Sequence, residues 1–519
     1  MTRLLSLRLG ITPEQTAVLR RHSLFRQANA AIRSQETLIY YDTPAANLER
    51  RGVRLALRRQ GGGWVQIVTT RPARSPGMME LRLWQSPYLN RFEFDGIDDA
   101  AVRDWLRQPK LIRRLRPVSE CSFRRAAWTL QPTADVDIHA KLDRGWIIAA
   151  GRREELSELM LEIERGAVTD LYDVALALGL RTPLFPEALS RPERGRRLFV
   201  NAPRLPVKAG SVNLEPELRP VAAFRLIALD CLAQMHANHE GAVGTNDPEY
   251  VHQMRVATRR LRAAMRLFNP VLPNEFVEAV MPSLRELMAV LGRTRDLDVL
   301  LDEIVTPVAE AMPGEPRLAN LMAVVTERLY QARRAAVAFL GRPDYARLHL
   351  TAGRLLSAPP FLDAPDYVAE AAVNADAAPA AEDSLVVFAE RRLRRLLKAT
   401  RAYAECARSD DPPTLHALRI SIKRLRYGFE FFGTLAPKRS GAIIAKRLAG
   451  LQEELGQLND LANAGQILMV CAGQDTALRE AVTLIGGWHG KRHAELLVAI
   501  PDQLAQVGGL KIPRFAGNR

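Results

Sequence analysis

Two segments of the chain each combine a histidine with a stripe of basic side chains at helical spacing. In the first segment the steps are three and four residues, so one helix face carries His252, Arg255, Arg259, Arg262 and Arg266. In the second segment the same steps give His416, Arg419, Lys423 and Arg426. Arginine forks match phosphate oxygens and lysine offers a compact point charge, so such a face could bind a chain of phosphates.

A basic helix face is usually a solvated surface, but two observations argue for an acidic group against these helices. Residues 251–268 and 412–429 contain no acid, whereas solvated faces usually alternate charge signs. Like charges at these spacings cost about a few tenths of a kcal/mol per pair unless something neutralises them. The neutralising group is either a ligand, such as a phosphate chain, or a set of internal acids, for which the candidates are Asp296, Asp298 and Asp460. We expect no metal here, because neither histidine has a second histidine or a carboxylate at i+3 or i+4.

The two basic stripes belong to an internal repeat. Residues 251–268 match residues 415–432 at an offset of 164 positions. Both copies begin with an Asp-Pro pair, at Asp247 and Asp411, which favours a helix start because Asp caps the first amides and Pro has no amide to leave unbonded. We therefore expect two copies of one helical unit.

A second stripe on each of these helices is almost entirely apolar. At about 100° per residue it forms a face that we expect to be buried core, with no cofactor implied. The first copy of this face comprises Val251, Met254, Thr258, Leu261, Met265 and Phe268, and the second comprises Leu415, Leu418, Ile422, Leu425, Phe429 and Phe432.

The doubled motif resembles the CHAD family, the conserved-histidine α-helical domains. The matching letters are HxxRVxxRRLR, LGxxRDLDVL and LHxLRIxxKRLRYxxEFF, and the resemblance covers residues 217–507. It implies an all-α domain of two pseudo-symmetric bundles whose basic faces meet in a groove that binds inorganic polyphosphate. By motif position the groove would be lined by His252, Arg255, Arg259, Arg260, Arg262, His416, Arg419, Lys423, Arg424 and Arg426, and Arg266 extends the first stripe.

Up to about residue 200 the chain carries short runs typical of β-strands, separated by turn residues. These runs are residues 36–41, 53–57, 64–68, 91–94 and 146–149. Gly61, Gly62 and Gly63 lie between two runs and predict a hairpin turn, since glycine accepts positive φ. The alternative, a phosphate-binding loop, would need a helix start and Lys-Ser/Thr directly afterwards.

Residues 1–199 resemble a CYTH or triphosphate-tunnel domain through YYDTPAANLERRGVRLALRRQGGGW, LDRGWI, LEIERG and PERGRRLF. The resemblance implies a closed antiparallel β-tunnel in which carboxylates hold a metal and basic residues grip a triphosphate. The opening strand departs from the family's ExExK, because Leu4, Ser6 and Arg8 stand in its place, and the LRxR motif has Ala56 for its first arginine. The tunnel residues that persist are Arg58, Arg124, Asp143, Glu162 and Glu164.

The missing acids predict a tunnel that is non-catalytic or severely impaired, because metal-assisted hydrolysis needs carboxylates that hold a divalent cation. Glu162 and Glu164 alternate along one strand and share a face, where they could hold a cation weakly or pair with arginines. Binding through the helical domain would need no cofactor. Mg²⁺ or Mn²⁺ would matter only if the tunnel retained activity.

The preferred interpretation is a protein that binds inorganic polyphosphate through its helical domain. One alternative is a metal-dependent inorganic triphosphatase of the CYTH type with a binding domain attached. Another is a nucleic-acid-binding protein. The sequence argues against nucleic acid, because the basic stripes are not interleaved with the aromatic residues on which single-strand binders stack bases.

Composition and charge fit a folded protein with a polyanionic partner. Of 519 residues, 47% are hydrophobic and 25% charged, and Lys plus Arg outnumber Asp plus Glu by 73 to 58, giving a net charge of +15. Most of that excess lies in residues 1–200. The four cysteines are far apart, which argues against a disulfide or zinc framework and fits a reducing cytoplasm. The start predicts no secretory signal and no run is long and apolar enough for a membrane span, so we expect a cytoplasmic protein, with polyphosphate granules as a candidate location.

These patterns predict a multidomain chain. A proline-bearing linker separates an α+β antiparallel tunnel from an all-α domain, and a segment rich in Ala, Pro and acid divides the helical halves. The predicted boundaries are 1–199 for the tunnel, 200–216 for the linker, 217–507 for the helical domain with halves at about 217–362 and 384–507, 363–383 for the dividing segment, and 508–519 for a tail.

Overall fold

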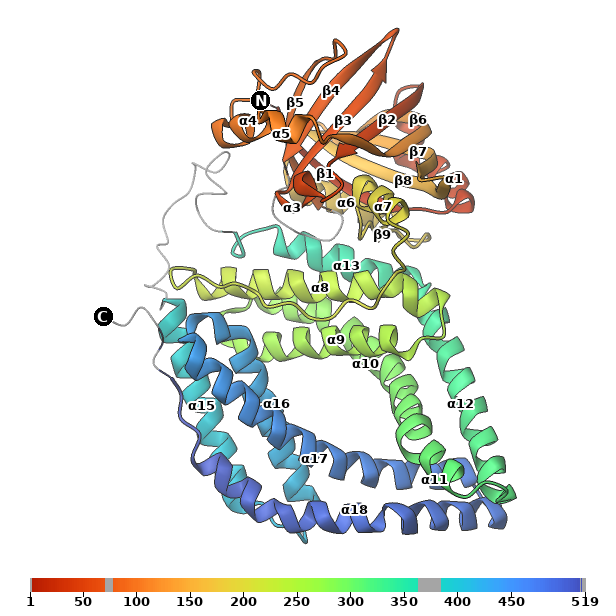
Figure 1. Ribbon diagram of the computed structural model, residues 1–519, viewed down its shortest axis with the longest axis vertical. Coiled ribbons are helices and arrows are strands. Elements are labelled where there is room, and N and C mark those ends of the chain that lie inside the picture. Colours follow the sequence, from red (N-terminus) through yellow and green to blue (C-terminus); the bar gives the residue numbers. More distant parts are fainter. Residues whose placement is uncertain (1, 71–77, 363–383, 514, 516–519) are drawn as a thin grey trace. The chain divides into compact units, whose positions relative to one another are not determined.

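The computed structural model describes residues 2–70, 78–362, 384–513 and 515, and it divides the chain into two compact units (Figure 1). The first unit comprises Met1–Leu205 and Gly341–Pro359, and the second comprises Pro206–Leu340 and Pro360–Arg519. The dividing segment predicted at 363–383 lies outside the described residues.

The first unit is built on an antiparallel sheet of nine strands. In the order β5-β4-β3-β2-β6-β7-β8-β1-β9, each strand pairs with its neighbours, and β1 also pairs with β5, which closes the sheet into a ring. This topology confirms the antiparallel tunnel that the sequence predicted. The strands are β1 Thr2–Gly10, β2 Ile32–Asp42, β3 Val53–Gln60, β4 Gly63–Thr70, β5 Met78–Pro87, β6 Arg116–Thr133, β7 Val136–Ala149, β8 Arg152–Arg165 and β9 Phe185–Pro186.

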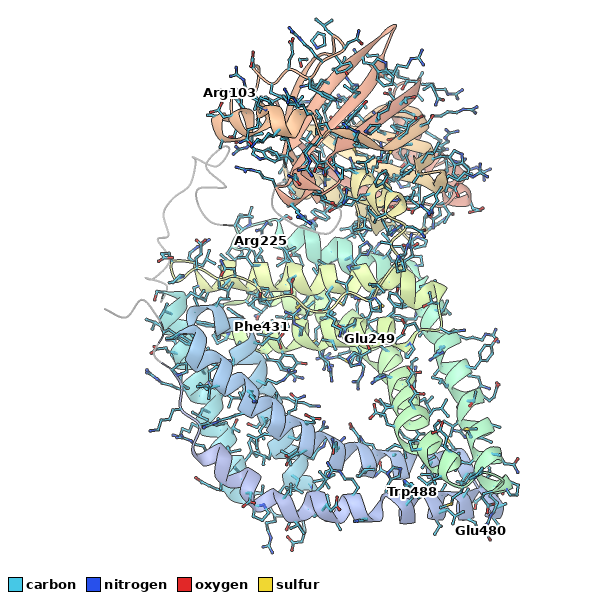
Figure 2. The ribbon with its side chains drawn as sticks, viewed as in Figure 1. Arg103, Arg225, Glu249, Phe431, Glu480 and Trp488 are labelled. Carbon is cyan, nitrogen blue, oxygen red and sulfur yellow. The ribbon has the colours of Figure 1, made fainter. Side chains whose placement is uncertain are left out.

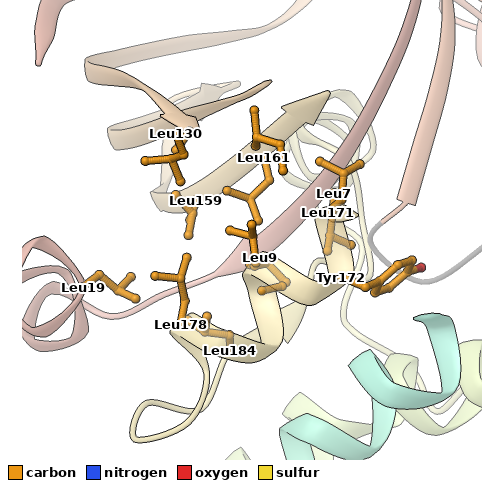
Figure 3. Close-up of a cluster of buried hydrophobic side chains, with 14 of the residues drawn as sticks. Leu7, Leu9, Leu19, Leu130, Leu159, Leu161, Leu171, Tyr172, Leu178 and Leu184 are labelled. Carbon is orange, nitrogen blue, oxygen red and sulfur yellow. The ribbon is translucent and has the colours of Figure 1, made fainter. Parts of the chain in front are cut away.

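Residues on the outer face of this sheet form a large apolar core with the covering helices. Leu7 and Leu9 of β1 are fully buried there with Leu159 and Leu161 of β8 and with helix α6 (Figure 3). Because side chains alternate across a strand, Ser6 and Arg8 of β1 point to the opposite face, the interior of the tunnel. The described helices of this unit are α1 Pro13–Arg20, α2 Ser23–Gln27, α3 Asn47–Arg50, α4 Ala100–Leu106, α5 Pro109–Ile112, α6 Val168–Leu178, α7 Arg191–Phe199 and α13 Pro343–Leu356.

Helix α13 lies within the range predicted for the helical domain, yet it packs on α6 of the first unit. The contact depends on a glycine: a Cβ at Gly353 would lie 2.6 Å from Cε1 of Tyr172. Arg354 adds an ion pair with Asp173, with Nε 2.5 Å from Oδ1.

Four of the five predicted strand runs lie in β2, β3, β4 and β7, but the run at 91–94 is not a strand. The amide of Glu93 donates to Oε1 of Gln66 at 3.0 Å, and Nε2 of Gln66 donates to the Glu93 carbonyl at 2.5 Å. The Gln66 side chain therefore makes the two backbone hydrogen bonds that a neighbouring strand would otherwise make with Glu93. The hairpin is confirmed, because Gln60 pairs with Gly63 and Gly61 has φ +60°.

The second unit is all helical and contains the predicted repeat. Helices α9 and α16 start 164 residues apart, as do α10 and α17. Each copy places its four long helices in the same sequential contacts, α8–α9–α10–α12 and α15–α16–α17–α18. The helices are α8 Pro220–Gly244, α9 Pro248–Phe268, α10 Asn274–Val299, α11 Thr306–Ala311, α12 Pro316–Leu340, α15 Leu385–Cys406, α16 Pro412–Phe432, α17 Lys438–Ala472 and α18 Thr476–Gly508, with a π-helical turn at Leu300–Val305.

Every residue of the two predicted apolar stripes is buried, which confirms them as core. The two copies meet through equivalent residues: the rings of Phe268 and Phe432 lie 5.5 Å apart, and Phe388 lies 5.3 Å from Phe268. Helix α9 consequently packs against α16. In the part of the chain that the structure describes, no helix has both the length and the apolar character needed to cross a bilayer.

Candidate anion-binding site

Helices α9, α15 and α16 enclose a pocket of about 580 Å³, which we call the α9–α16 pocket. Six basic residues from three helices line it: Arg259, Arg262, Arg266, Arg392, Lys423 and Arg424. No acidic residue is among its lining residues, and the rest of the wall is apolar except for Tyr427. The wall includes Met288, contributed by α10. The repeat therefore brings its two basic stripes to one cavity.

The charges in this pocket are not compensated. Burial, together with the nearby Arg419 and Arg259 guanidiniums, lowers the pKa of Lys423 to about 8, and Asp460 offsets only part of this effect. Burial also lowers the pKa of Arg262 and of Arg266, and in both cases Arg285 adds to the effect. Each of these groups would be stabilised in its charged form by an anion.

Several guanidiniums along these helices also have a donor without an acceptor. The Nε atoms concerned are buried and make no hydrogen bond among the described residues, which ordinarily costs about 1–3 kcal/mol per group. They belong to Arg255, Arg259, Arg262, Arg392, Arg419 and Arg426. Oxygen atoms of a ligand would supply the missing acceptors.

The predicted stripe residues divide between the pocket and its surroundings. Arg259, Arg262, Arg266, Lys423 and Arg424 line the pocket, whereas the remaining stripe residues stand on the same helices outside its lining. Burial and the Arg295 guanidinium lower the pKa of His252. His416 is exposed, with Nδ1 2.9 Å from Oδ1 of Asn459.

Arg260 does not line the pocket, contrary to the prediction from its motif position. Its side chain is 2% exposed and makes two ion pairs, Nε to Oε1 of Glu430 at 2.6 Å and Nη1 to Oδ2 of Asp230 at 2.9 Å. Its guanidinium also lies 5.9 Å from the centroid of the Phe431 ring. Phe431 is labelled in Figure 2. One residue along a helix turns the side chain by about 100°, so Arg260 faces the core while Arg259 faces the pocket.

Of the three acids considered as internal counter-ions, one contacts a stripe residue. Nη2 of Arg255 lies 3.4 Å from Oδ1 of Asp296, whose pKa is raised by burial and by nearby Asp460. Asp298 is buried and pairs instead with Arg333 at 2.7 Å. These acids leave the pocket-lining groups without a hydrogen-bonded carboxylate.

The two predicted basic stripes do not include Arg392. It stands on α15, and its Nη2 donates to the carbonyl of Arg266 at 3.2 Å, so it bridges the two copies. The basic run from Arg391 to Lys398 was a usable signal, but its pocket-facing member depends on how α15 packs on α16.

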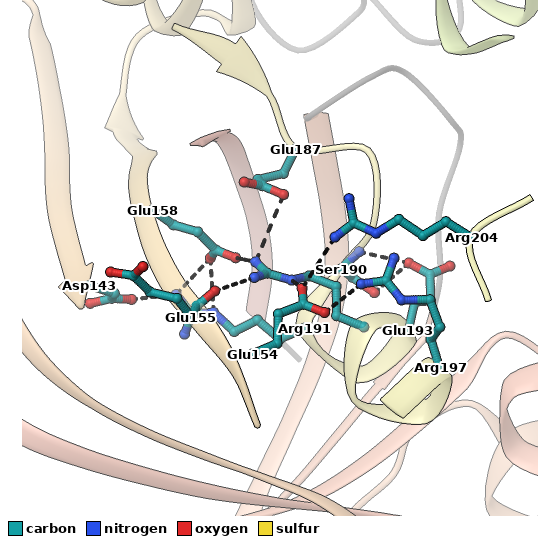
Figure 4. Close-up of polar contacts among 11 residues, drawn as sticks. Asp143, Glu154, Glu155, Glu158, Glu187, Ser190, Arg191, Glu193, Arg197 and Arg204 are labelled. Carbon is teal, nitrogen blue, oxygen red and sulfur yellow. Dashed lines mark hydrogen bonds and ion pairs between the residues drawn. The ribbon is translucent and has the colours of Figure 1, made fainter. Parts of the chain in front are cut away.

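In the tunnel interior of the first unit, by contrast with the α9–α16 pocket, buried arginines are paired with carboxylates (Figure 4). Asp143 accepts from Arg125 at 2.8 and 2.7 Å and from Arg191 at 2.5 Å. Glu158 accepts from Arg191 at 2.9 Å and from Arg194 at 3.1 Å. Burial alone would raise the pKa of both carboxyls, but the guanidiniums outweigh it and leave both pKa values lowered. We call these five residues the tunnel network.

The other tunnel residues predicted from the sequence are also engaged or face elsewhere. Glu162 pairs with Lys141 at 2.7 Å and Glu164 with His139 at 2.9 Å. Arg58 donates to Oε1 of Gln85 at 3.2 Å and to that of Gln60 at 3.3 Å.

The prediction that Arg124 is a tunnel residue was wrong by one position. Its neighbour Arg125 contacts the interior Asp143, and strand alternation therefore places Arg124 on the outer face, where it is exposed.

A divalent cation does not fit the tunnel residues that are present. The carboxylates of Asp143 and Glu158 are saturated by arginines of β6 and α7, and Glu162 is held by a lysine. The described residues contain no group of three or more His, Cys, Asp and Glu side chains suited to a metal ion. The tunnel motifs do not identify Arg191 and Arg194, although Arg191 directly precedes PERGRRLF and its spacing of three from Arg194 signals one helix face.

Comparison with known proteins identifies relatives of the helical unit. The family model for the CHAD domain matches residues 226–469. The crystal structure of the CHAD domain from the plant Ricinus communis is 31% identical, covers 60% of this chain and 100% of its own, and superposes with a TM-score of 0.51.

Two uncharacterised proteins from strains of Mycobacterium tuberculosis are 28% identical over 242 residues, which is 45% of this chain and 44% of theirs. The chain thus spans less than half the length of the curated relatives it matches. A Hippeastrum protein with a dominant triphosphatase activity covers 38% of this chain at 13% identity, with a TM-score of 0.29, a likeness too weak to support an argument.

Proposed function

Because the chain belongs to the CHAD family through its helical unit, we propose that this unit binds inorganic polyphosphate in the α9–α16 pocket. The observation that carries the proposal is that six basic side chains share this cavity without an acidic lining residue. A polyanion would supply the missing counter-charge, and its oxygens would accept from the buried donors that have no partner.

The chemistry of the side chains favours phosphate over other anions. Guanidiniums form two parallel hydrogen bonds with phosphate oxygens, and a row of them from two helices matches a ligand with repeated charges. Lys423 adds a point charge near Arg259 and Arg419, which lower its pKa in addition to burial. A chain of phosphates engages several of these groups at once, which strengthens binding through effective concentration.

The α9–α16 pocket is poorly suited to single-stranded nucleic acid. Tyr427 is the one aromatic residue among its lining residues, and its ring is buried, with 8% of the residue exposed. Base recognition by stacking needs open aromatic faces. Duplex DNA remains a polyanion, so competition is the discriminating measurement.

We further propose that the first unit is not catalytic and that binding needs neither Mg²⁺ nor Mn²⁺. The acids that a CYTH-type triphosphatase would use for a cation are neutralised here by Arg125, Arg191 and Arg194. A protein with this function would be found in the cytoplasm, including on polyphosphate granules.

The proposal is tested by titrating the full chain with long-chain polyphosphate at several salt concentrations, with duplex DNA and RNA as competitors. A helical-site variant carries Arg259→Ala, Arg262→Ala, Lys423→Ala and Arg424→Ala. We expect it to bind about a hundredfold more weakly, since hydrogen bonds to charged groups contribute about 1.5–3 kcal/mol each and are not additive.

A matched control removes four exposed basic residues outside the pocket, through Arg293→Ala, Arg334→Ala, Lys398→Ala and Lys491→Ala. It should bind within about threefold of the wild type, because surface charges act weakly through screened solvent. Equal losses in both variants would assign binding to general charge. Displacement by DNA at equal phosphate concentration would also contradict the proposal, and magnesium-dependent phosphate release would contradict the non-catalytic assignment.

A further inference from the structure

The first unit has a second basic cavity, on the outer face of its sheet. It measures about 1030 Å³ and lies over β2, β6 and β7 beside the end of α1. Its basic lining residues are Arg20, Arg33, Arg124, Arg125 and Arg144, and Glu155 is the single acid among all lining residues. We call this cavity the outer-face pocket. It opens on the side of the sheet away from the tunnel interior, although Arg125, a member of the tunnel network, also contributes to its lining.

Strand register places the central arginines in one row. Gln35 of β2 is directly opposite Arg124 of β6, and Arg124 is directly opposite Arg144 of β7. Like charges directly opposite each other in an antiparallel pair destabilise a sheet. The fold nevertheless sets Arg124 and Arg144 side by side, so a compensating anion is the simplest partner for this row.

The described residues neutralise the row only in part: Glu14 of α1 interacts electrostatically with Arg144, and Glu155 is the one acid in the lining. Arg125 is held by Asp143 on the interior side, but Arg33, Arg124 and Arg144 make no ion pair or side-chain hydrogen bond with any described residue. All three are exposed, so their guanidiniums are accessible to a ligand. Like the α9–α16 pocket, the outer-face pocket therefore gathers several arginines that have no hydrogen-bonded carboxylate among the described residues.

A glycine shapes the floor of the outer-face pocket. Gly145 stands opposite Phe123, and a Cβ there would lie 2.1 Å from the carbonyl oxygen of Ser122 and 2.5 Å from Cα of Phe123. Strands β6 and β7 approach closely at this point because position 145 carries no side chain. Gly145 pairs with Phe123, which is buried on the tunnel side of the sheet, so Gly145 contributes backbone to the lining next to Arg144.

We propose that the outer-face pocket is a second binding site, specific for a short linear phosphate chain. Three exposed guanidiniums, one each from the neighbouring strands β2, β6 and β7, can bind several phosphate groups bidentately. The single nearby exposed aromatic ring, Trp146, is already covered by the Arg153 guanidinium at 4.6 Å from its centroid. Among its described lining residues, the pocket therefore has no open aromatic ring on which a base could stack, so we expect it to recognise the phosphate chain itself.

This site goes beyond the proposed function, because it is on the other unit and its occupancy does not require the α9–α16 pocket. The test uses the full chain carrying the helical-site substitutions, so that only the outer-face pocket remains. Tripolyphosphate and ATP are titrated separately by calorimetry into this protein. The same titrations are repeated after adding Arg124→Ala with Arg144→Ala. A matched control adds Arg59→Ala with Arg114→Ala, two exposed arginines of the same unit outside the pocket.

We expect the helical-site variant to bind one equivalent of tripolyphosphate. Adding Arg124→Ala with Arg144→Ala should weaken that binding by about tenfold or more. Adding the control pair Arg59→Ala with Arg114→Ala should leave it unchanged. Equal binding of ATP would identify the triphosphate moiety, and weaker ATP binding an unsubstituted chain; both support the site. Absence of binding in the helical-site variant, or equal losses in both added pairs, would overturn it.

Displacement of tripolyphosphate from the helical-site variant by duplex DNA at equal phosphate concentration would also overturn the assignment to short chains. The outcomes separate the two sites. If the helical-site variant keeps the full polyphosphate affinity of the wild type, the proposed function fails whatever the outer-face pocket does.

Discussion

Two regions of this protein concentrate arginine, and they treat its charge in opposite ways. In the tunnel network, Arg191 is buried between Glu158 and Asp143, and these carboxylates raise its pKa despite the cost of burial. In the α9–α16 pocket, burial and neighbouring cations lower the pKa values of Arg262 and Lys423. The arginines of the tunnel network have their counter-ions within the protein, whereas the basic residues of the α9–α16 pocket need a ligand to supply counter-charge.

The comparison teaches how to distinguish structural from functional arginines. A buried guanidinium whose pKa is raised already has its counter-ions and contributes to folding. A half-buried guanidinium whose pKa is lowered stores unfavourable charge that a bound anion can relieve. Adjacent residues differ in their contacts in the same way, because Arg260 pairs with Glu430 and Asp230 while Arg259 lines the α9–α16 pocket, which has no acidic lining residue.

The largest expected effect comes from breaking the tunnel network. Arg191→Ala leaves Asp143 and Glu158 buried without their shared partner, and removal of one member of a buried ion pair costs about 3–5 kcal/mol. We expect the first unit of the full chain to unfold at a lower denaturant concentration, followed by intrinsic fluorescence in a urea titration. Polyphosphate affinity should stay at the wild-type value.

The control for this change is Arg59→Ala, an exposed arginine of β3 whose loss should move the transition by less than about 0.5 kcal/mol. If Arg191→Ala unfolds no earlier than Arg59→Ala, the tunnel network contributes little to stability and its contrast with the α9–α16 pocket fails.

The next prediction separates the neighbours Arg259 and Arg260. Arg260→Ala removes a 2% exposed side chain with two ion pairs, and we expect a loss of about 2–3 kcal/mol in the free energy of unfolding. Arg259→Ala should leave stability unchanged or slightly higher, since it removes repulsion, and should weaken polyphosphate binding about tenfold. Thermal unfolding and titration of both variants measure the two effects. The opposite pattern would mean that Arg260, rather than Arg259, faces the ligand.

This pair also shows what sequence alone could predict. Period and spacing were sufficient for the apolar stripes and for the cluster of Arg259, Arg262 and Lys423, because helix geometry fixes which residues share a face. The partners of Arg260 are 30 and 170 residues away, so its burial depends on tertiary packing that no local pattern records.

In the strands, the prediction error concerns which face of the sheet a side chain occupies. The residue that enters the tunnel was assigned as Arg124, whereas Arg125 contacts Asp143, because a shift of one residue moves every side chain of a strand to the other face. The motif fixed the strand but not its register. Likewise, the partners of Arg191 lie 33 and 48 residues away, so helical spacing can place Arg191 on a face with Arg194 but cannot identify the carboxylates that it binds.

A smaller effect is expected from pH, and it sharpens the comparison because it reports on a single group. The pKa of Lys423 is lowered to about 8 in the free protein, and a bound polyanion should raise it. Binding then takes up a proton above pH 8, so affinity should be constant below that pH and fall above it. The fall can reach about tenfold per pH unit for one proton.

Titrations between pH 6.5 and about 9.5 at constant ionic strength check this prediction, with Lys423→Arg as the matched variant because its guanidinium stays charged throughout the range. We expect Lys423→Arg to retain binding at pH 7 and to lose the alkaline dependence. An unchanged dependence in Lys423→Arg would assign it to another group.

The smallest expected effect concerns the acids that border the α9–α16 pocket. Asp296 lies 3.4 Å from Arg255, and Asp460 partly offsets the lowering of the Lys423 pKa. A polyanion must approach against these two charges, so Asp296→Asn with Asp460→Asn should tighten binding by about two- to fivefold, or about 0.4–1 kcal/mol. The effect should shrink as salt rises, since screening weakens exposed charges.

Asp502→Asn, which changes an exposed acid on α18, is the control and should leave affinity unchanged. Weaker binding in the double variant would instead show that these acids hold Arg255 in its binding position, which would place internal counter-ions within the ligand site.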